Sequence, residues 1–161
     1  MTRRPVAPTA LDAEVERKVA VELFNYTWTL LENPGRTARD DDEMVNAAHA
    51  SRHHWERIGT PVNHARGEWQ LARVYAVLGR PEPALHHARR CLELCEAHGI
   101  GDFDLAYAHE ALARAHAAAG EPEGAARHED LAREAAAAIA EDDDRQQLLA
   151  DLATLYRAAD G

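Results

Sequence analysis

Residues 71–96, LARVYAVLGRPEPALHHARRCLELCE, recur at residues 112–137 as LARAHAAAGEPEGAARHEDLAREAAA, with ten identities in 26 positions. The second stretch begins 41 residues after the first. A fixed spacing of this size indicates a helical repeat protein. Since each unit buries its apolar face against a neighbour, the repeat predicts an all-α solenoid, a stack of helix pairs with a concave surface.

The period extends beyond these two stretches in both directions. Trp28 precedes Trp69 by 41 residues, and Leu30 precedes Leu71 by the same distance. Near the other end, residues 152–156 (LATLY) resemble residues 71–75 (LARVY), which indicates the first helix of a fourth unit without its second helix. We therefore expect about three helix-turn-helix units followed by a C-terminal capping helix.

Start and stop signals divide the chain into seven expected helices. Acidic runs, Thr-Pro and Pro favour helix starts, and Gly favours helix ends. We expect one domain, residues 10–161, with units at 10–58, 60–99 and 102–140, a cap at 142–159 and a disordered segment at 1–9. The helices are expected at about residues 10–32, 40–57, 60–78, 81–98, 102–120, 122–140 and 142–159.

The best-preserved units resemble tetratricopeptide repeats (TPR). In each unit a small residue is followed three positions later by a ring, then by a turn glycine and by an alanine that opens the second helix. Glu68 replaces an expected aromatic residue, the usual final proline is absent, and the period is longer than the usual value of about 34, as in kinesin light chain repeats. The resemblance implies a right-handed superhelix whose first helices line an inner groove for protein–protein or peptide recognition. The matching positions are Ala72, Tyr75, Gly79 and Ala84, then Ala113, His116, Gly120 and Ala125.

The implied groove suggests candidate binding residues on the first helix of each unit. Residues three or four positions apart, away from the packing stripe, share one helix face. Arginine and aromatic side chains are common in binding hot spots, because guanidinium groups bind carboxylates and rings supply buried area. We therefore expect a noncatalytic adaptor or sensor that binds a protein or peptide, with an acidic segment as a candidate partner. The candidates are Asn25, Trp28, Glu32, Arg66, Trp69, Arg73, Phe103, Tyr107, Glu110 and Arg114.

Two other roles for these helices stay open. In the first, the tryptophans only fill gaps between units, while Arg73 and Arg114 pair with Glu32 and Glu110. In the second, the chain forms a homodimer through an uncapped end of the stack. The capping helix disfavours this at the C-terminal end, which leaves the helix at residues 10–32.

The chain holds ten histidines, which raise a different function class. His49 and His53 have the i, i+4 spacing that lets two imidazoles on one helix face share a metal ion. The alternative function is therefore a small-ligand or metal-binding helical protein, possibly an enzyme. However, Ala50 follows His49 where a zinc hydrolase helix carries Glu, and Ser51, the only serine, has no flanking glycines. We expect no cofactor and no catalytic motif.

The composition restricts the partners and the compartment. The net charge of −10 disfavours binding to nucleic acid or to anionic membranes. No stretch approaches the roughly 20 apolar residues that a membrane span needs. Cys91 and Cys95 are the only cysteines, so no disulfide framework is indicated and a reducing compartment, the cytoplasm, is expected.

Overall fold

The computed structural model describes residues 3–156, and within that range the chain is all-helical without a strand. The all-α fold class and the predicted seven helices are confirmed. The helices are α1 (Ala13–Leu31), α2 (Ala38–Ile58), α3 (Pro61–Val77), α4 (Pro81–His98), α5 (Asp102–Ala118), α6 (Pro122–Ala136) and α7 (Asp142–Leu152).

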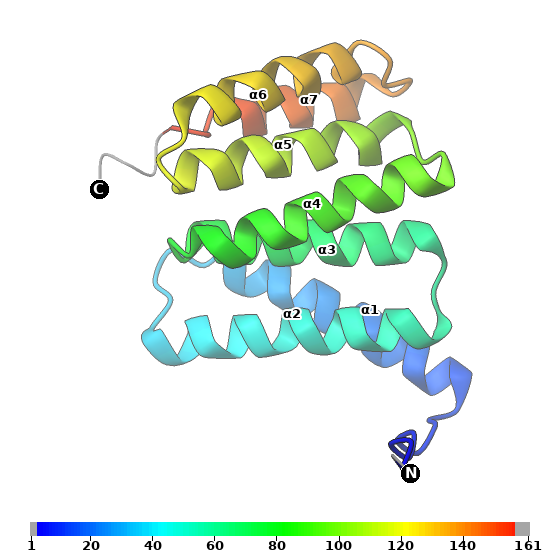
Figure 1. Cartoon of the computed structure of the whole chain (residues 1–161). Helices are drawn as coiled ribbons and strands as arrows, with labels where there is room; N and C mark the ends of the chain where they lie inside the picture. Colours follow the sequence, from blue (N-terminus) through cyan, green and yellow to red (C-terminus); the bar gives the residue numbers. More distant parts are fainter. Residues whose placement is uncertain (1–2, 157–161) are drawn as a thin grey trace.

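Successive helices form pairs, and the pairs stack along one direction (Figure 1). α1 packs against α2, α3 against α4, and α5 against α6. Contacts of α2 with α3 and of α4 with α5 join neighbouring pairs, and α7 lies against α5 and α6. This arrangement of three helix pairs and a last single helix is the helical-repeat architecture that the 41-residue period predicts.

Three predicted helix bounds are wrong, and the structure gives a reason for each. α1 begins at Ala13 because the side chain of Asp12 accepts hydrogen bonds from the backbone N–H groups of Glu14 and Val15, at 3.0 and 3.3 Å. α6 ends at Ala136, four residues early, because the chain turns to bury Ile139 in the core.

The third wrong bound is the end of α7, which was expected to reach residue 159. α7 ends at Leu152, where the Asp151 carbonyl accepts hydrogen bonds from Arg114 Nη2 at 2.9 Å and from Thr154 Oγ1 at 2.7 Å. In a continuing helix this carbonyl oxygen would accept a hydrogen bond from the backbone N–H group four residues later, and the two side-chain donors take its place. Residues 157–159 of the expected cap, and residues 1–2 of the expected N-terminal segment, lie outside the described range.

Alanine allows the helices of neighbouring units to approach closely. The four small positions in the tetratricopeptide-repeat pattern, Ala72, Ala84, Ala113 and Ala125, have no exposed surface. A larger side chain at such a position would separate the helix axes, because side-chain size sets the distance between packed helices. The small residues therefore fix the spacing of the stack.

Gly79 gives a test of the turn that separates α3 from α4. Its φ of +68° lies in the left-handed region, which L side chains adopt at a cost of about 1–2 kcal/mol. Gly79→Ala should therefore lower the free energy of unfolding by about that amount, measured by urea denaturation. Gly35→Ala is the control, because the φ of Gly35 is not positive and the nearest atom to an added methyl group, Asn33 Oδ1, is at 3.4 Å, an ordinary contact. An equal loss in both variants would contradict this explanation.

Candidate functional site

The first helices of the three pairs and α7 enclose a cavity of about 410 Å³. We call it the aromatic cavity. Six of the ten predicted groove residues border it. The lining residues are Trp28, Leu31 and Glu32 of α1, Trp69, Arg73 and Val77 of α3, Phe103 and Tyr107 of α5, and Gln147 and Asp151 of α7.

A continuous row of aromatic rings crosses this cavity from α1 to α5. The Trp28 and Trp69 ring centroids are 5.2 Å apart, and those of Trp69 and Tyr107 are 5.1 Å apart. Phe24 extends the row on α1 and Phe103 extends it on α5, with centroid distances of 6.3 and 4.5 Å to their neighbours. These tilted and edge-on contacts are the geometries that aromatic pairs prefer. The 41-residue period relates Trp28 to Trp69, and Tyr107 joins them from α5 to form one aromatic wall.

Carboxylates neutralise the arginines beneath this wall. Glu110 is fully buried, and Arg114 Nε donates a hydrogen bond to its Oε1 at 2.7 Å. Arg73 Nη2 lies 3.6 Å from the same Glu110 oxygen and 3.7 Å from Asp151 Oδ2. The pairing of Arg114 with Glu110 agrees with the packing alternative. Arg73 pairs with Glu110 and Asp151, and Glu32 makes no ion pair in the described part of the chain.

Asp151 of α7 also holds the ring of Tyr107 in place. Tyr107 Oη donates a hydrogen bond to Asp151 Oδ2 at 2.6 Å. Burial, together with this carboxylate, raises the pKa of Tyr107 far above its usual value, so the phenol remains a donor. The repeat pattern did not reveal Asp151, because α7 was assigned only a capping role.

The other predicted groove residues lie elsewhere. Asn25 is exposed and does not border the cavity. Arg66 borders a separate hollow of about 150 Å³, and its guanidinium group binds both oxygens of Asp104, at 2.8 and 3.1 Å. Glu110 and Arg114 lie beneath the aromatic cavity, with Arg114 reaching a neighbouring pocket.

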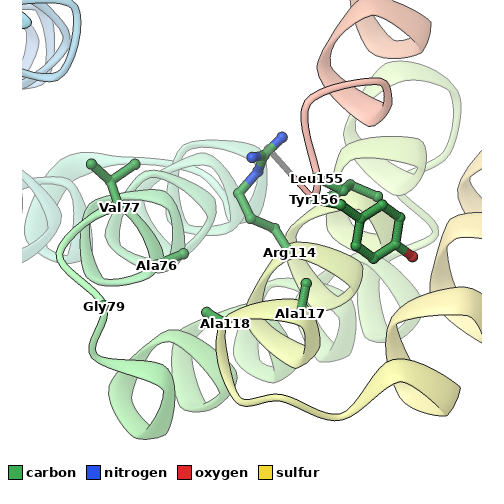
Figure 2. Close-up of a pocket in the computed structure, with 8 residues that line it drawn as sticks. All are labelled: Ala76, Val77, Gly79, Arg114, Ala117, Ala118, Leu155 and Tyr156. Carbon is green, nitrogen blue, oxygen red and sulfur yellow. The ribbon is translucent and has the colours of Figure 1, made fainter. Parts of the chain in front are cut away.

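That neighbouring pocket has a volume of about 350 Å³ and is mainly apolar. We call it the alanine pocket. In Figure 2 small side chains line its floor, with Val77 on one side and Tyr156 on the other. Val77 borders both cavities, so the two adjoin at this residue. The lining residues are Ala76, Val77, Gly79, Arg114, Ala117, Ala118, Leu155 and Tyr156.

The two histidines of the predicted metal pair have different neighbours. The His49 Nε2 atom lies 2.7 Å from Tyr75 Oη, whereas the His53 ring packs beside that of His54 at 5.6 Å. Among residues 3–156, no group of three or more His, Cys, Asp or Glu side chains is arranged to hold a metal ion. The i, i+4 spacing thus has no third ligand in this conformation.

Glu68, the main departure from the tetratricopeptide-repeat pattern, joins three helices. Its carboxylate accepts hydrogen bonds from His87 Nδ1 of α4 at 2.6 Å and from Arg52 Nε of α2 at 3.1 Å. Burial raises the pKa of Glu68, but these two partners outweigh that effect and leave the pKa below its usual value. An ionic link therefore replaces the aromatic contact expected at this position.

Three further histidines stack between α5 and α6. The ring of His128 lies between His109 and His116, with centroid distances of 5.6 and 5.5 Å. Burial and the two neighbouring histidines lower the pKa of His128 to about 4. Burial also lowers the pKa of His109, although Glu96 and Glu134 oppose this effect.

Comparisons of the chain with protein-family models, with curated proteins and with solved structures found no match. The likeness to tetratricopeptide repeats stays a prediction from the sequence pattern. Within residues 3–156, no helix combines the length and the apolar character needed to cross a membrane.

The two tryptophans of the aromatic row should differ in their effect on stability. Trp69 packs against all three core clusters, whereas Trp28 belongs to none of them. Trp69→Ala should lower the free energy of unfolding by about 3–5 kcal/mol, the usual cost of removing a large core side chain. Trp28→Ala should cost about 1 kcal/mol, as measured by urea denaturation. Equal losses of unfolding free energy in the two variants would show that Trp28 and Trp69 contribute equally to the core.

The histidine stack should make stability depend on pH. The folded-state pKa of His128 is lower than its unfolded value of about 6.5, so the folded state binds fewer protons. The contribution of the neutral His128 ring to the free energy of unfolding is therefore complete above about pH 6.5 and is lost as the pH falls toward 4. Thermal unfolding followed from pH 7.5 to 4.5 should show a weaker decline in His128→Gln than in the original chain.

The control for this experiment is His98→Gln, because His98 is exposed at the end of α4, away from the stack. It should keep the original pH profile. The same profile in His128→Gln would show that other groups cause the acid sensitivity.

Proposed function

We propose that this protein is a noncatalytic, tetratricopeptide-repeat-like binding module that holds an extended segment of another protein in its groove. The observation that carries the proposal is that the aromatic cavity and the alanine pocket lie next to each other, with Val77 at the border of both. One cavity offers rings and polar groups, and the other offers a small apolar recess. Such a combination of apolar area with a few placed polar groups is typical of binding sites.

The charges favour a partner different from the expected acidic segment. Arg66, Arg73 and Arg114 are each paired with a carboxylate, so an acidic ligand would have to displace an existing partner. Glu32, by contrast, is exposed at the cavity and makes no ion pair within the described residues. Asp151, also at the cavity, is already held by Tyr107 and Arg73. We therefore propose a segment that carries Lys or Arg.

The alanine pocket adds a second requirement on the segment. Its walls are apolar, and the Arg114 guanidinium group at its edge is already bound to Glu110 and to the Asp151 carbonyl. An aliphatic side chain therefore suits this pocket better than a charged one. The net charge of −10 would speed the approach of a basic partner at low salt. The proposed motif is a basic residue near an aliphatic residue.

The test is selection of binding peptides from a displayed random library. We expect the enriched peptides to carry Lys or Arg close to Leu, Ile or Val. Glu32→Lys and Val77→Asp should each weaken binding of a selected peptide about tenfold, measured by calorimetry, because they reverse the charge or insert a charge at exposed groove positions. Both sites are exposed, so the fold should persist.

The matched control is Glu43→Lys, which makes the same charge change on the exposed face of α2 outside both cavities. It should leave the affinity unchanged. Enrichment of acidic peptides would contradict the proposed partner. Failure of the library to yield any peptide that is sensitive to Glu32→Lys or Val77→Asp would contradict the proposed groove.

A small ligand is the second candidate, because the aromatic cavity of about 410 Å³ lies within the usual range for ligand pockets. A native mass spectrum of gently purified protein would report a retained ligand or metal as excess mass that is lost on denaturation. Either function suits a reducing cytoplasm, since Cys91 and Cys95 are free buried thiols.

A further inference from the structure

Exposed apolar side chains concentrate near the first helix. In the described range, seven large hydrophobic side chains are exposed. Two of them, Val77 and Tyr156, border the groove. The other five lie within residues 6–26, although this segment is a small part of the chain. They are Val6, Leu11, Val15, Val21 and Tyr26.

Two of these side chains belong to a stripe on the outer face of α1. Val15, Lys18, Glu22 and Tyr26 are spaced three and four residues apart and are all exposed, so they share one helix face. We call these four residues the α1 stripe. The residues of α1 buried in the stack lie on the other side of the helix. They are Glu16, Ala20, Thr27 and Leu30.

The α1 stripe is self-complementary when the helix is reversed. A two-fold axis near residue 20 would place Lys18 opposite Glu22 of a second copy, and Val15 opposite Tyr26 of that copy. The Lys18–Glu22 pair is centred on residue 20, and the Val15–Tyr26 pair is centred between residues 20 and 21. These two centres differ by about 0.75 Å along the helix axis. One axis therefore satisfies both pairs. In a two-fold interface both copies use the same patch, so residue i of one copy contacts residue j of the other, and residue j contacts residue i. The α1 stripe has this form.

The charges along the stripe also favour a second copy. The stripe carries one positive and one negative charge, whereas the whole chain carries −10. Within one copy, Lys18 Nζ lies 3.6 Å from Glu22 Oε1, and both side chains are more than half exposed. An exposed pair of this kind contributes little to stability, so both groups can bind a second chain at small cost.

We propose that two copies of this chain associate through antiparallel packing of their α1 stripes. The proposal concerns the outer face of α1 and is independent of the groove function. The contact is smaller than the roughly 800 Å² per partner of standard interfaces, so the dimer is weak and depends on concentration. At the other end of the stack, Leu148, Leu152 and Leu155 are already buried, so they offer no comparable surface.

The test is sedimentation velocity of the 161-residue chain over a series of concentrations. We expect a reversible shift from monomer to dimer. Lys18→Glu and Glu22→Lys should each weaken association about tenfold or more, because like charges then face each other twice across the axis. An equimolar mixture of the two variants should regain dimers. The double variant Lys18→Glu/Glu22→Lys should regain them as well.

These recoveries distinguish antiparallel pairing from a general effect of charge. Circular dichroism melting should give similar curves for all variants, since the substituted positions are exposed. Glu43→Lys, the control on α2, should dimerise like the original chain. A chain that stays monomeric at the highest concentration would overturn the proposal. Dimers that persist in the single variants, or that the mixture fails to restore, would overturn the proposed pairing.

Discussion

The position of one ring, Trp69, determines how the three repeats meet. Its indole packs against all three core clusters and lies about midway between Trp28 and Tyr107 in the aromatic row. The spacing of α1, α3 and α5, and with it the width of the aromatic cavity, therefore depends on this side chain. Its Nε1 atom is buried without a hydrogen-bond partner among the described residues. The ring is thus held by packing, through its contacts with Trp28, Tyr107 and the core.

A second constraint is the charge buried beneath that ring. An isolated carboxylate in the core would be costly, and Glu110 has no exposed surface. Arg73 and Arg114, from α3 and α5, both reach its Oε1 oxygen, at 3.6 and 2.7 Å. Arg73 thereby ties α3 to α5. Glu32 is a lining carboxylate of the cavity that makes no ion pair within the described residues.

The sequence predicted the parts of the fold that repeat. The 41-residue period identified the helix pairs and placed Trp28 and Trp69 at equivalent positions of the first two units. Features set by contacts between distant segments were not accessible in this way. The choice of Asp151 as partner of Tyr107 and Arg73 depends on how α7 docks, which no repeat specifies. The early end of α6 likewise depends on the burial of Ile139, a tertiary effect that overrides the helix-forming alanines after Ala136.

The docking of α7 has a consequence for how such a groove can change in evolution. α7 supplies Asp151 and Gln147 to a cavity otherwise built by the repeats, and residues 137–141 are all that connects it to α6. Each residue of a helix turns by about 100°, given 3.6 residues per turn. Leu148 and Leu152, on the neighbouring face of α7, are buried in the core and fix its register, so the connection itself would absorb an inserted residue. The lining of the cavity could thus change by substitution at Gln147, while the repeats and their core stayed the same.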